Sequence, residues 1–261
     1  MIVHHTNMTG LCNRLRGLAA WRTVAAMRNE AFRMYWQPSR TCPVEFYELF
    51  EGMPLLHLSK ITGEEQVVNC EGPWGEGTHA CDKPWDIWSR HRPCGNVHYF
   101  MKHVQYAMRQ LKPTPAVETA FEAARPPYAY HMVGVHVRGT DNVAEAKKQG
   151  IYLRAEAYIQ RMQQIQRRLP STEFFVACDN IGDEAAIRDA VPGVHVQPKH
   201  YDSQHVRHTT MKAALVDLMI LSRCSRIIGT WGSSFSEYAA MLGGIELETP
   251  FLTREVVLRQ K

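Results

Sequence analysis

The second half of the chain alternates between strand-like and helix-like segments, and this alternation constrains the fold more than any other feature. Short apolar runs rich in Val, Ile and Phe separate longer stretches whose apolar residues recur at helical spacing. Because parallel strands need a long crossover connection, usually a helix, four such alternations predict a parallel sheet flanked by helices. The expected strands are 130–137, 174–178, 194–196 and 226–229, and the expected helices are 154–168, 184–189, 211–222 and 235–242.

The first half begins in the same way and then becomes irregular. A short strand at 2–4, a glycine turn, a helix at about 13–28 and a strand at 32–36 repeat the strand, helix, strand order. From Pro38 to Gly95 the sequence is rich in Gly, Pro, Trp and Cys, and its pattern places no element. Helical spacing returns from 100 to about 124, and Arg125-Pro126-Pro127 then breaks it. We therefore expect two domains, residues 1–126 and 127–261.

The composition excludes several classes of protein. The net charge of the 261 residues is only +4, and Lys and Arg are not gathered into runs, so we expect no nucleic-acid partner, whereas a local site for an anionic ligand fits. The N-terminus has no basic segment followed by a long apolar run, which predicts neither a signal peptide nor a membrane span and a cytoplasmic location.

The chain has seven cysteines and no C-x-x-C pair, which favours free thiols in a reducing compartment. The alternative is a zinc site held by Cys70, Cys81, Cys94 and either His79 or His98, although these spacings match no common zinc module. Three further histidines, His200, His205 and His208, lie in the segment 199–208. A mobile loop that gates a ligand pocket, a metal site or plain solvent exposure are the possible interpretations of this segment.

The apolar run 133–137 ends abruptly in polar residues. Because ligands of open α/β sheets bind at the carboxyl ends of the strands, we expect His136, Arg138 and Asp141 to lie at a ligand site. An arginine can donate two parallel hydrogen bonds to phosphate oxygens, and Asp141 is placed to act as a base or to orient Arg138. The polar segment 142–150, which carries Glu145, either closes over a ligand or is a solvated loop without a role.

The turn 9–16 has the outline of a phosphate site. Gly10 lets the backbone turn into a helix whose exposed amides and positive dipole end attract an anion, and Asn13 adds an amide donor. The alternative interpretation is that Asn13 only caps the helix and that the arginines of this turn coat its surface.

Two segments near the C-terminus complete the set of candidates. Ser234 with Glu237 fits a capping box, and the hydroxyls of Ser233 and Ser234 are suited to donate to a pyrophosphate, although a tight structural turn is equally consistent. Asp217 lies in an otherwise apolar helix, where burial costs free energy unless the carboxylate is paired. The two adjacent donors of guanine would satisfy it, and so would a basic side chain or a backbone amide.

Taken in order, these pieces resemble the inverting α1,6-fucosyltransferase superfamily, which includes nodulation fucosyltransferases, core fucosyltransferases and, more distantly, protein O-fucosyltransferases. The resemblance lies in the segments 10–15 and 136–141 and in Asp217 with Ser233 and Ser234. It implies an α/β fold of GT-B type, with two Rossmann-like domains that face a cleft, a parallel sheet in each, an acceptor-side first domain and a second domain that binds the GDP-sugar.

The resemblance also implies roles for individual residues. His136 and Asp217 would hold guanine, Arg138 would neutralise the β-phosphate, and Gly10, Asn13, Ser233 and Ser234 would line the pyrophosphate. The implied reaction is transfer of L-fucose from GDP-fucose to a glycan acceptor, with inversion and without a metal or other cofactor. The chain has no Asp-x-Asp triplet, so arginine and helix ends would stabilise the leaving diphosphate.

Two departures leave the general base open. The family has a second arginine where this chain has Gly139, and Glu145 stands one place from the family's acidic position. Asp141 and Glu145 are therefore both candidates. An inactive GDP-sugar-binding module and a transferase of another nucleotide sugar remain as alternatives, whereas a dinucleotide oxidoreductase is disfavoured because no G-x-G-x-x-G follows a strand.

Overall fold

The computed structural model describes residues 2–6, 9–36, 38–52, 66–69, 83–140, 143–148, 150–152, 154–201, 208–250 and 252–253. The chain divides into two compact units, Met1–Ala116 and Val117–Lys261. This division differs from the predicted one only in residues 117–126, and the acceptor and donor roles assigned to the two domains stay predictions. Among the described residues, no helix is long and apolar enough to cross a bilayer.

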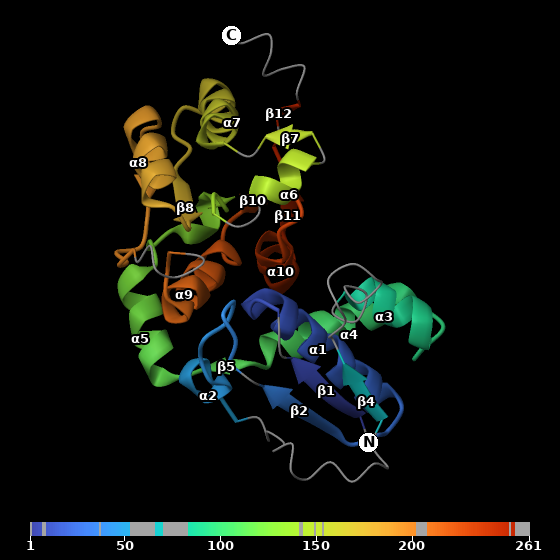
Figure 1. Cartoon of the computed structure of the whole chain (residues 1–261). Coiled ribbons are helices and arrows are strands. Elements are labelled where there is room, and N and C mark those ends of the chain that lie inside the picture. The colour runs from blue at the N-terminus through green and yellow to red at the C-terminus, as the bar shows by residue number, and fades with distance from the viewer. Residues whose placement is uncertain are drawn as a thin grey trace. The chain divides into compact units, whose positions relative to one another are not determined.

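The first unit contains a three-stranded parallel sheet in the order β2-β1-β4 (Figure 1). Its long first helix is buried along most of its length and contacts the helices that follow later in the chain. A short antiparallel pair, β3 with β5, lies outside this sheet. The elements are β1 (Ile2–Thr6), α1 (Leu11–Met27), β2 (Phe32–Trp36), α2 (Phe46–Leu49), β3 (Phe50–Glu51), β4 (Gln66–Asn69), α3 (Pro84–His91), α4 (Val97–Arg109) and β5 (Lys112–Pro113).

The second unit contains a five-stranded sheet in the order β11-β10-β6-β8-β9, in which all neighbours are parallel. The elements up to its second strand are α5 (Pro115–Ala124), a 3-10 turn (Ala129–His131), β6 (Val133–Val137), α6 (Val143–Lys148), β7 (Ile151–Tyr152), α7 (Ala155–Arg168) and β8 (Phe174–Cys178). The remaining elements are α8 (Ile181–Ala190), β9 (Val194–His195), α9 (Met211–Leu221), β10 (Arg226–Ile228), α10 (Ser234–Gly243), β11 (Glu246–Glu248) and β12 (Leu252–Thr253), which pairs with β7.

Both faces of this sheet are covered by helices, which explains why β6 and β8 are buried at every residue. On one face Val133, Val135 and Val137 pack with residues of α7 and α8 in a single apolar cluster. On the other face α9 approaches so closely that a side chain at Gly134 would lie 2.9 Å from Leu221. The predicted alternation of strands and helices in the second half is confirmed.

Several predicted elements differ from the structure in extent, and two of the differences have a clear cause. The helix expected from 100 to 124 is divided into α4 and α5, because Pro113 and Pro115 lack the amide hydrogen that a continuous helix needs. The strand expected from 130 begins at Val133, since residues 129–131 form a 3-10 turn. The irregular stretch between Pro38 and Gly95 contains α2, β3, β4 and α3 among its described residues.

Candidate functional site

The connections of the second unit single out one position on its sheet. From β6 the chain continues to β8 and β9 on one side, and it returns to β10 and β11 on the other. In open parallel sheets, ligands bind outside the carboxyl ends of the strands at the point where the strand order reverses. The candidate site is therefore the edge at which β6 and β10 end.

Thr230, which follows β10, joins the two strand ends at this edge. Its Oγ1 donates to the carbonyl of His136 at 2.9 Å and accepts from the backbone N–H of Arg138 and the hydroxyl of Tyr158, each at 3.0 Å. Burial raises the pKa of the Tyr158 hydroxyl, which therefore remains a donor. These bonds fix the backbone on both sides of the last residue of β6.

The imidazole of His136 is held in one orientation. The side chain is buried, and its Nδ1 lies 2.7 Å from Oγ of Ser236, which also accepts a hydrogen bond from the backbone N–H of Thr230 at 3.0 Å. The ring stacks on Phe235 with centroids 4.6 Å apart and an interplanar angle of 25°. His136 thus lies at the predicted strand end with a fixed ring plane, and its contact with a base stays a prediction.

The loop after β6 is fixed by a carboxylate from the neighbouring strand end. Asp179 follows β8, and its two oxygens accept hydrogen bonds from the backbone N–H of Gly139 at 2.8 Å and from the hydroxyl of Thr140 at 2.7 Å. Arg138 is partly exposed in this loop. Of the two candidate bases, Asp141 lies outside the described residues, and Glu145 belongs to α6 but its side chain lies outside them.

The structure gives a physical reason for the glycine at 139. A side-chain carbon added to Gly139 would collide with Oδ2 of Asp183, in the first turn of α8, so the carboxylate occupies the space that a larger residue would need. Asp183 is half-buried, and its pKa is raised by burial and by the neighbouring charges of Asp179 and Glu156. Gly139 thus stands where the family has its second arginine, and the carboxylate of Asp183 lies in the space where that side chain would begin.

The capping box predicted for α10 was wrong. Ser233, not Ser234, is the N-cap residue, and its side chain makes no capping hydrogen bond. Its Oγ is buried and has no hydrogen-bond partner among the described residues. Gly232 has a φ of +63°, a conformation that favours glycine, and it turns the chain into α10. The first residues of α10 thus present a positive helix end and an unsatisfied hydroxyl at the sheet edge.

Asp217 is buried in α9, as predicted, but a basic side chain pairs with it. Lys199, in the segment after β9, places Nζ 2.8 Å from Oδ2 of Asp217 and 3.9 Å from Oε2 of Glu184. Tyr201 donates to the same oxygen of Glu184 at 2.5 Å and to the carbonyl of Cys178, the last residue of β8, at 3.1 Å. We call Lys199, Asp217, Glu184 and Tyr201 the Lys199 cluster.

The glycine turn of the first unit opens α1, as predicted. Gly10 is the N-cap residue, and no side chain caps the helix, so the alternative that Asn13 is the cap was wrong. The carboxamide oxygen of Asn13 accepts from the Arg16 guanidinium at 3.3 Å. The arginines do not coat the surface, because Arg14 and Arg16 are only 1% and 4% exposed, and Arg14 donates to the carbonyl of Thr9 at 2.7 Å.

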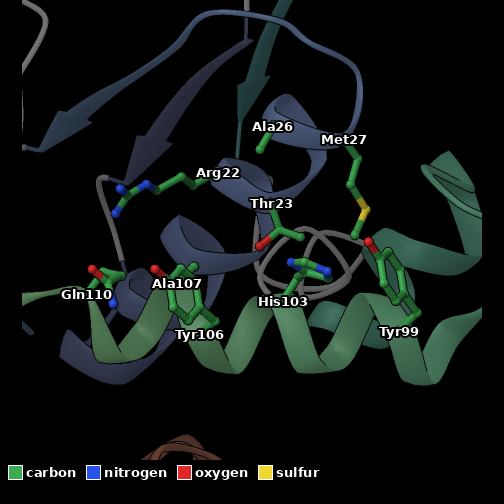
Figure 2. Close-up of a pocket in the computed structure, with 9 residues that line it drawn as sticks. All are labelled: Arg22, Thr23, Ala26, Met27, Tyr99, His103, Tyr106, Ala107 and Gln110. Carbon is green, nitrogen blue, oxygen red and sulfur yellow. The ribbon is translucent and has the colours of Figure 1, made fainter.

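A hollow of about 380 Å³ lies between α1 and α4 of the first unit. Figure 2 shows Tyr99, His103 and Tyr106 on the side of α4 that faces α1, with Thr23 and Met27 opposite them. Both tyrosines remain more than half exposed. The hollow therefore offers aromatic ring faces next to hydroxyl and imidazole groups, a combination found in small-ligand sites.

Sequence reasoning missed most of the residues that hold the site together. Ser236 and Lys199 contact residues that lie far away in the sequence and had no local signal, whereas Asp179 and Thr230 directly follow predicted strands. The zinc alternative stays untested because Cys70, His79 and Cys81 lie outside the described residues, as do residues 202–207 of the histidine-rich segment. Within the described chain, Cys12, Cys42, Cys94, Cys178 and Cys224 are thiols and not disulfides.

Solved structures with a similar fold include several fucosyltransferases. NodZ, an alpha-1,6-fucosyltransferase solved after soaking with GDP-fucose, is 18% identical with a TM-score of 0.55, and the match covers 92% of each chain. FUT1 of Arabidopsis thaliana, as its R284K mutant in complex with GDP, is 15% identical with a TM-score of 0.59 over 95% of this chain and 69% of that one. POFUT1 in complex with GDP is 12% identical with a TM-score of 0.52, and the match covers 95% of this chain and 98% of that one.

The chain has the fold of these fucosyltransferases. The comparison confirms the predicted α/β fold of GT-B type and, at the level of the fold, the predicted resemblance to the fucosyltransferase superfamily. No protein-family model matches the sequence, and no curated protein matches it either. At these identities the fucosyltransferase fold is shared, and the residues of the site must carry any argument about activity.

Proposed function

We propose that this chain is a glycosyltransferase that transfers L-fucose from GDP-fucose to a sugar acceptor, with inversion and without a metal. The observation that carries the proposal is the arrangement at the reversal point of the second sheet. There His136, Arg138 and Ser233 are brought to one edge by Thr230 and Ser236, in a fold shared with enzymes solved with GDP or GDP-fucose.

In this proposal the diphosphate binds at the start of α10. The backbone amides of the first turn and the positive helix end favour an anion, and the unsatisfied hydroxyl of Ser233 would donate to it. Ser234, the first helical residue, is partly exposed beside it. Arg138 supplies the full positive charge that a departing GDP requires, which is how the reaction proceeds without a metal in this scheme. Gly10 and Asn13 are proposed as further diphosphate contacts.

Inversion requires a base that removes the proton from the acceptor hydroxyl on the face opposite to the leaving GDP. Asp141 and Glu145 are both proposed for this role, since both follow the fixed loop of Arg138. Asp141→Asn and Glu145→Gln separate them. The variant that lacks the base should lose at least a hundredfold in kcat while its Kd for GDP stays within a factor of three.

The acceptor is proposed to be a glycan, and the hollow between α1 and α4 is proposed to hold one of its sugar units. Tyrosine rings beside hydroxyl groups suit a ligand with apolar C–H faces and many hydroxyls. Arg22 follows Gly10 by twelve residues, about 18 Å along a helix, so only an extended acceptor would reach both ends of α1. Tyr106→Ala should therefore raise KM for a long glycan acceptor and leave Kd for GDP unchanged, with exposed Tyr128→Ala as the control.

The decisive experiment incubates the purified chain with GDP-fucose and EDTA, with and without a panel of glycans, and measures GDP release. Release under EDTA supports the proposal. Activity that requires added Mg²⁺ or Mn²⁺ refutes the metal-independent scheme. GDP binding without turnover would identify a binding module, and preference for another GDP- or UDP-sugar in a parallel binding panel would replace fucose as the donor sugar.

A further inference from the structure

The two oxygens of the Asp217 carboxylate have different environments. Oδ2 accepts a hydrogen bond from Nζ of Lys199 at 2.8 Å. Oδ1 is buried and has no hydrogen-bond partner among the described residues. A buried acceptor without a donor costs free energy. A bound molecule that donates an N–H to Oδ1 would remove this cost and would therefore bind more tightly.

Lys199 determines whether this carboxyl group is charged. Burial raises the pKa of Asp217 to about 6, and Lys199, together with Gln197, opposes that rise. The side chains of Lys199 and Asp217 are 1% and 6% exposed, so solvent screens their attraction little. Removing the ammonium would leave only Gln197 to oppose the effect of burial on this pKa, and Asp217 would then hold its proton at neutral pH.

The Lys199 cluster lies close to the carboxyl end of the sheet. Tyr201 bonds to the carbonyl of Cys178 at the end of β8, and Glu184 belongs to the first two turns of α8, which follows that strand. A molecule held at the sheet edge would therefore be near the Lys199 cluster.

We propose that Lys199 is a positioning residue for the nucleotide base, which holds Oδ2 of Asp217 and keeps the carboxylate ionised, so that Oδ1 accepts an N–H of the base. This inference rests on the proposed function, because it takes Asp217 as a contact of the donor. A protonated Asp217 would instead direct an O–H toward the N–H edge of guanine, and two donors would oppose each other. Adenine presents an acceptor at the same ring position, so protonation of Asp217 would weaken the binding of ADP less than that of GDP.

Other ionisable groups lie around α9 and must be separated from Asp217. Tyr201 and Glu184 face it within the Lys199 cluster, and Cys178 lies at the end of β8. The neighbouring β6 and α10 carry His136 and Glu237, and histidines also titrate near neutral pH. Asp217→Asn is the reference, because any pH dependence that remains in it belongs to another group.

The experiment measures Kd for GDP and ADP by calorimetry between pH 5.5 and 8.5. Lys199→Met, which keeps the length of the side chain, should move the midpoint of the pH profile upward by about two units and thereby weaken GDP binding at pH 7 about tenfold. Lys199→Arg should keep the wild-type midpoint, and Asp217→Asn should bind GDP weakly at all pH values. The proposal would be overturned if Lys199→Met weakened GDP binding by the same factor at every pH, or did not weaken it at all.

A second measurement keeps this inference separate from the proposed function. The ionisation midpoint of Asp217 is read by carbon NMR of the labelled carboxyl group in the chain alone, with Lys199→Gln as a second variant if Lys199→Met does not fold. A wild-type chain that does not bind GDP refutes the proposed function and the role of Asp217 in base binding. A midpoint that does not rise in either lysine variant refutes the control of Asp217 by Lys199, whatever the chain binds.

Discussion

Replacing Thr230 with Val tests whether one hydroxyl holds the two strand ends together. Val has nearly the same shape but cannot hydrogen-bond, so the change leaves the carbonyl of His136, the N–H of Arg138 and the hydroxyl of Tyr158 without this partner. At about 1 kcal/mol for each backbone group at the sheet edge and somewhat more for the buried phenol, the free energy of unfolding should fall by about 3 kcal/mol.

A double-mutant cycle with Tyr158→Phe measures the coupling between the hydroxyls of Thr230 and Tyr158. Alone, Tyr158→Phe removes one hydrogen bond and should cost about 1 kcal/mol. In the Thr230→Val background the phenol has already lost its partner, so removing its hydroxyl should cost nothing further. The double variant should therefore lose less unfolding free energy than the sum of the two single variants, by about 1 kcal/mol or more.

The free energies are measured by urea denaturation followed by circular dichroism, and hydrogen exchange of β6 and β10 locates the loss. Thr172→Val serves as the control, because its hydroxyl is at a partly exposed position of the same unit and makes no hydrogen bond among the described residues. That control should change stability by less than about 0.5 kcal/mol. Strict additivity in the cycle, or a loss below about 1 kcal/mol for Thr230→Val, would refute the account.

Three further predictions use other contacts of the second unit. Gly139→Ala should lower the free energy of unfolding by about 1 kcal/mol, and Asp183→Ala in the same chain should restore most of it, since the alanine methyl meets the Asp183 carboxylate. Because the pKa of Asp217 is raised to about 6, the folded state binds its proton more tightly than the unfolded chain, so stability measured by urea denaturation should fall between about pH 4 and 6 and level off above, and Asp217→Asn should lose this slope. Arg161→Gln breaks a two-bond ion pair with Glu248 and should cost about 0.5–1 kcal/mol in low salt and less in 1 M NaCl, as thermal melts would show.

The parts of the fold that were predictable are those that local patterns encode. The strand 174–178 was predicted with the exact limits of β8, because five consecutive apolar residues between polar ones have few other interpretations. The division between α4 and α5 was missed although Pro113 and Pro115 mark it, because the apolar spacing continues on both sides. Helix α8 begins three residues before its predicted start because Asn180 caps it, with its carboxamide oxygen 2.9 Å from the N–H of Gly182.

The candidate site was predictable only where it follows strands. His136 and Arg138 were placed at a strand end from the sequence, and the structure has them there. The pairing of Lys199 with Asp217 was foreseen only as a general possibility, because the two residues are eighteen positions apart in the chain and no local pattern links them. The cap of α10 was assigned one residue late, since two adjacent serines give the same pattern and only the backbone geometry distinguishes them.

The order of the strands also has a consequence for how the chain reaches its native state. β6 lies at the centre of the sheet, yet one of its two neighbours, β10, is about ninety residues later in the chain. Contacts of such long sequence separation form slowly, because a large loop must close before they are made. During synthesis, β6 would pair with β8 and leave a valine-rich edge exposed until β10 emerges, and exposed apolar edges promote aggregation. Truncation before Arg226 should therefore yield an aggregating chain and not a smaller folded domain.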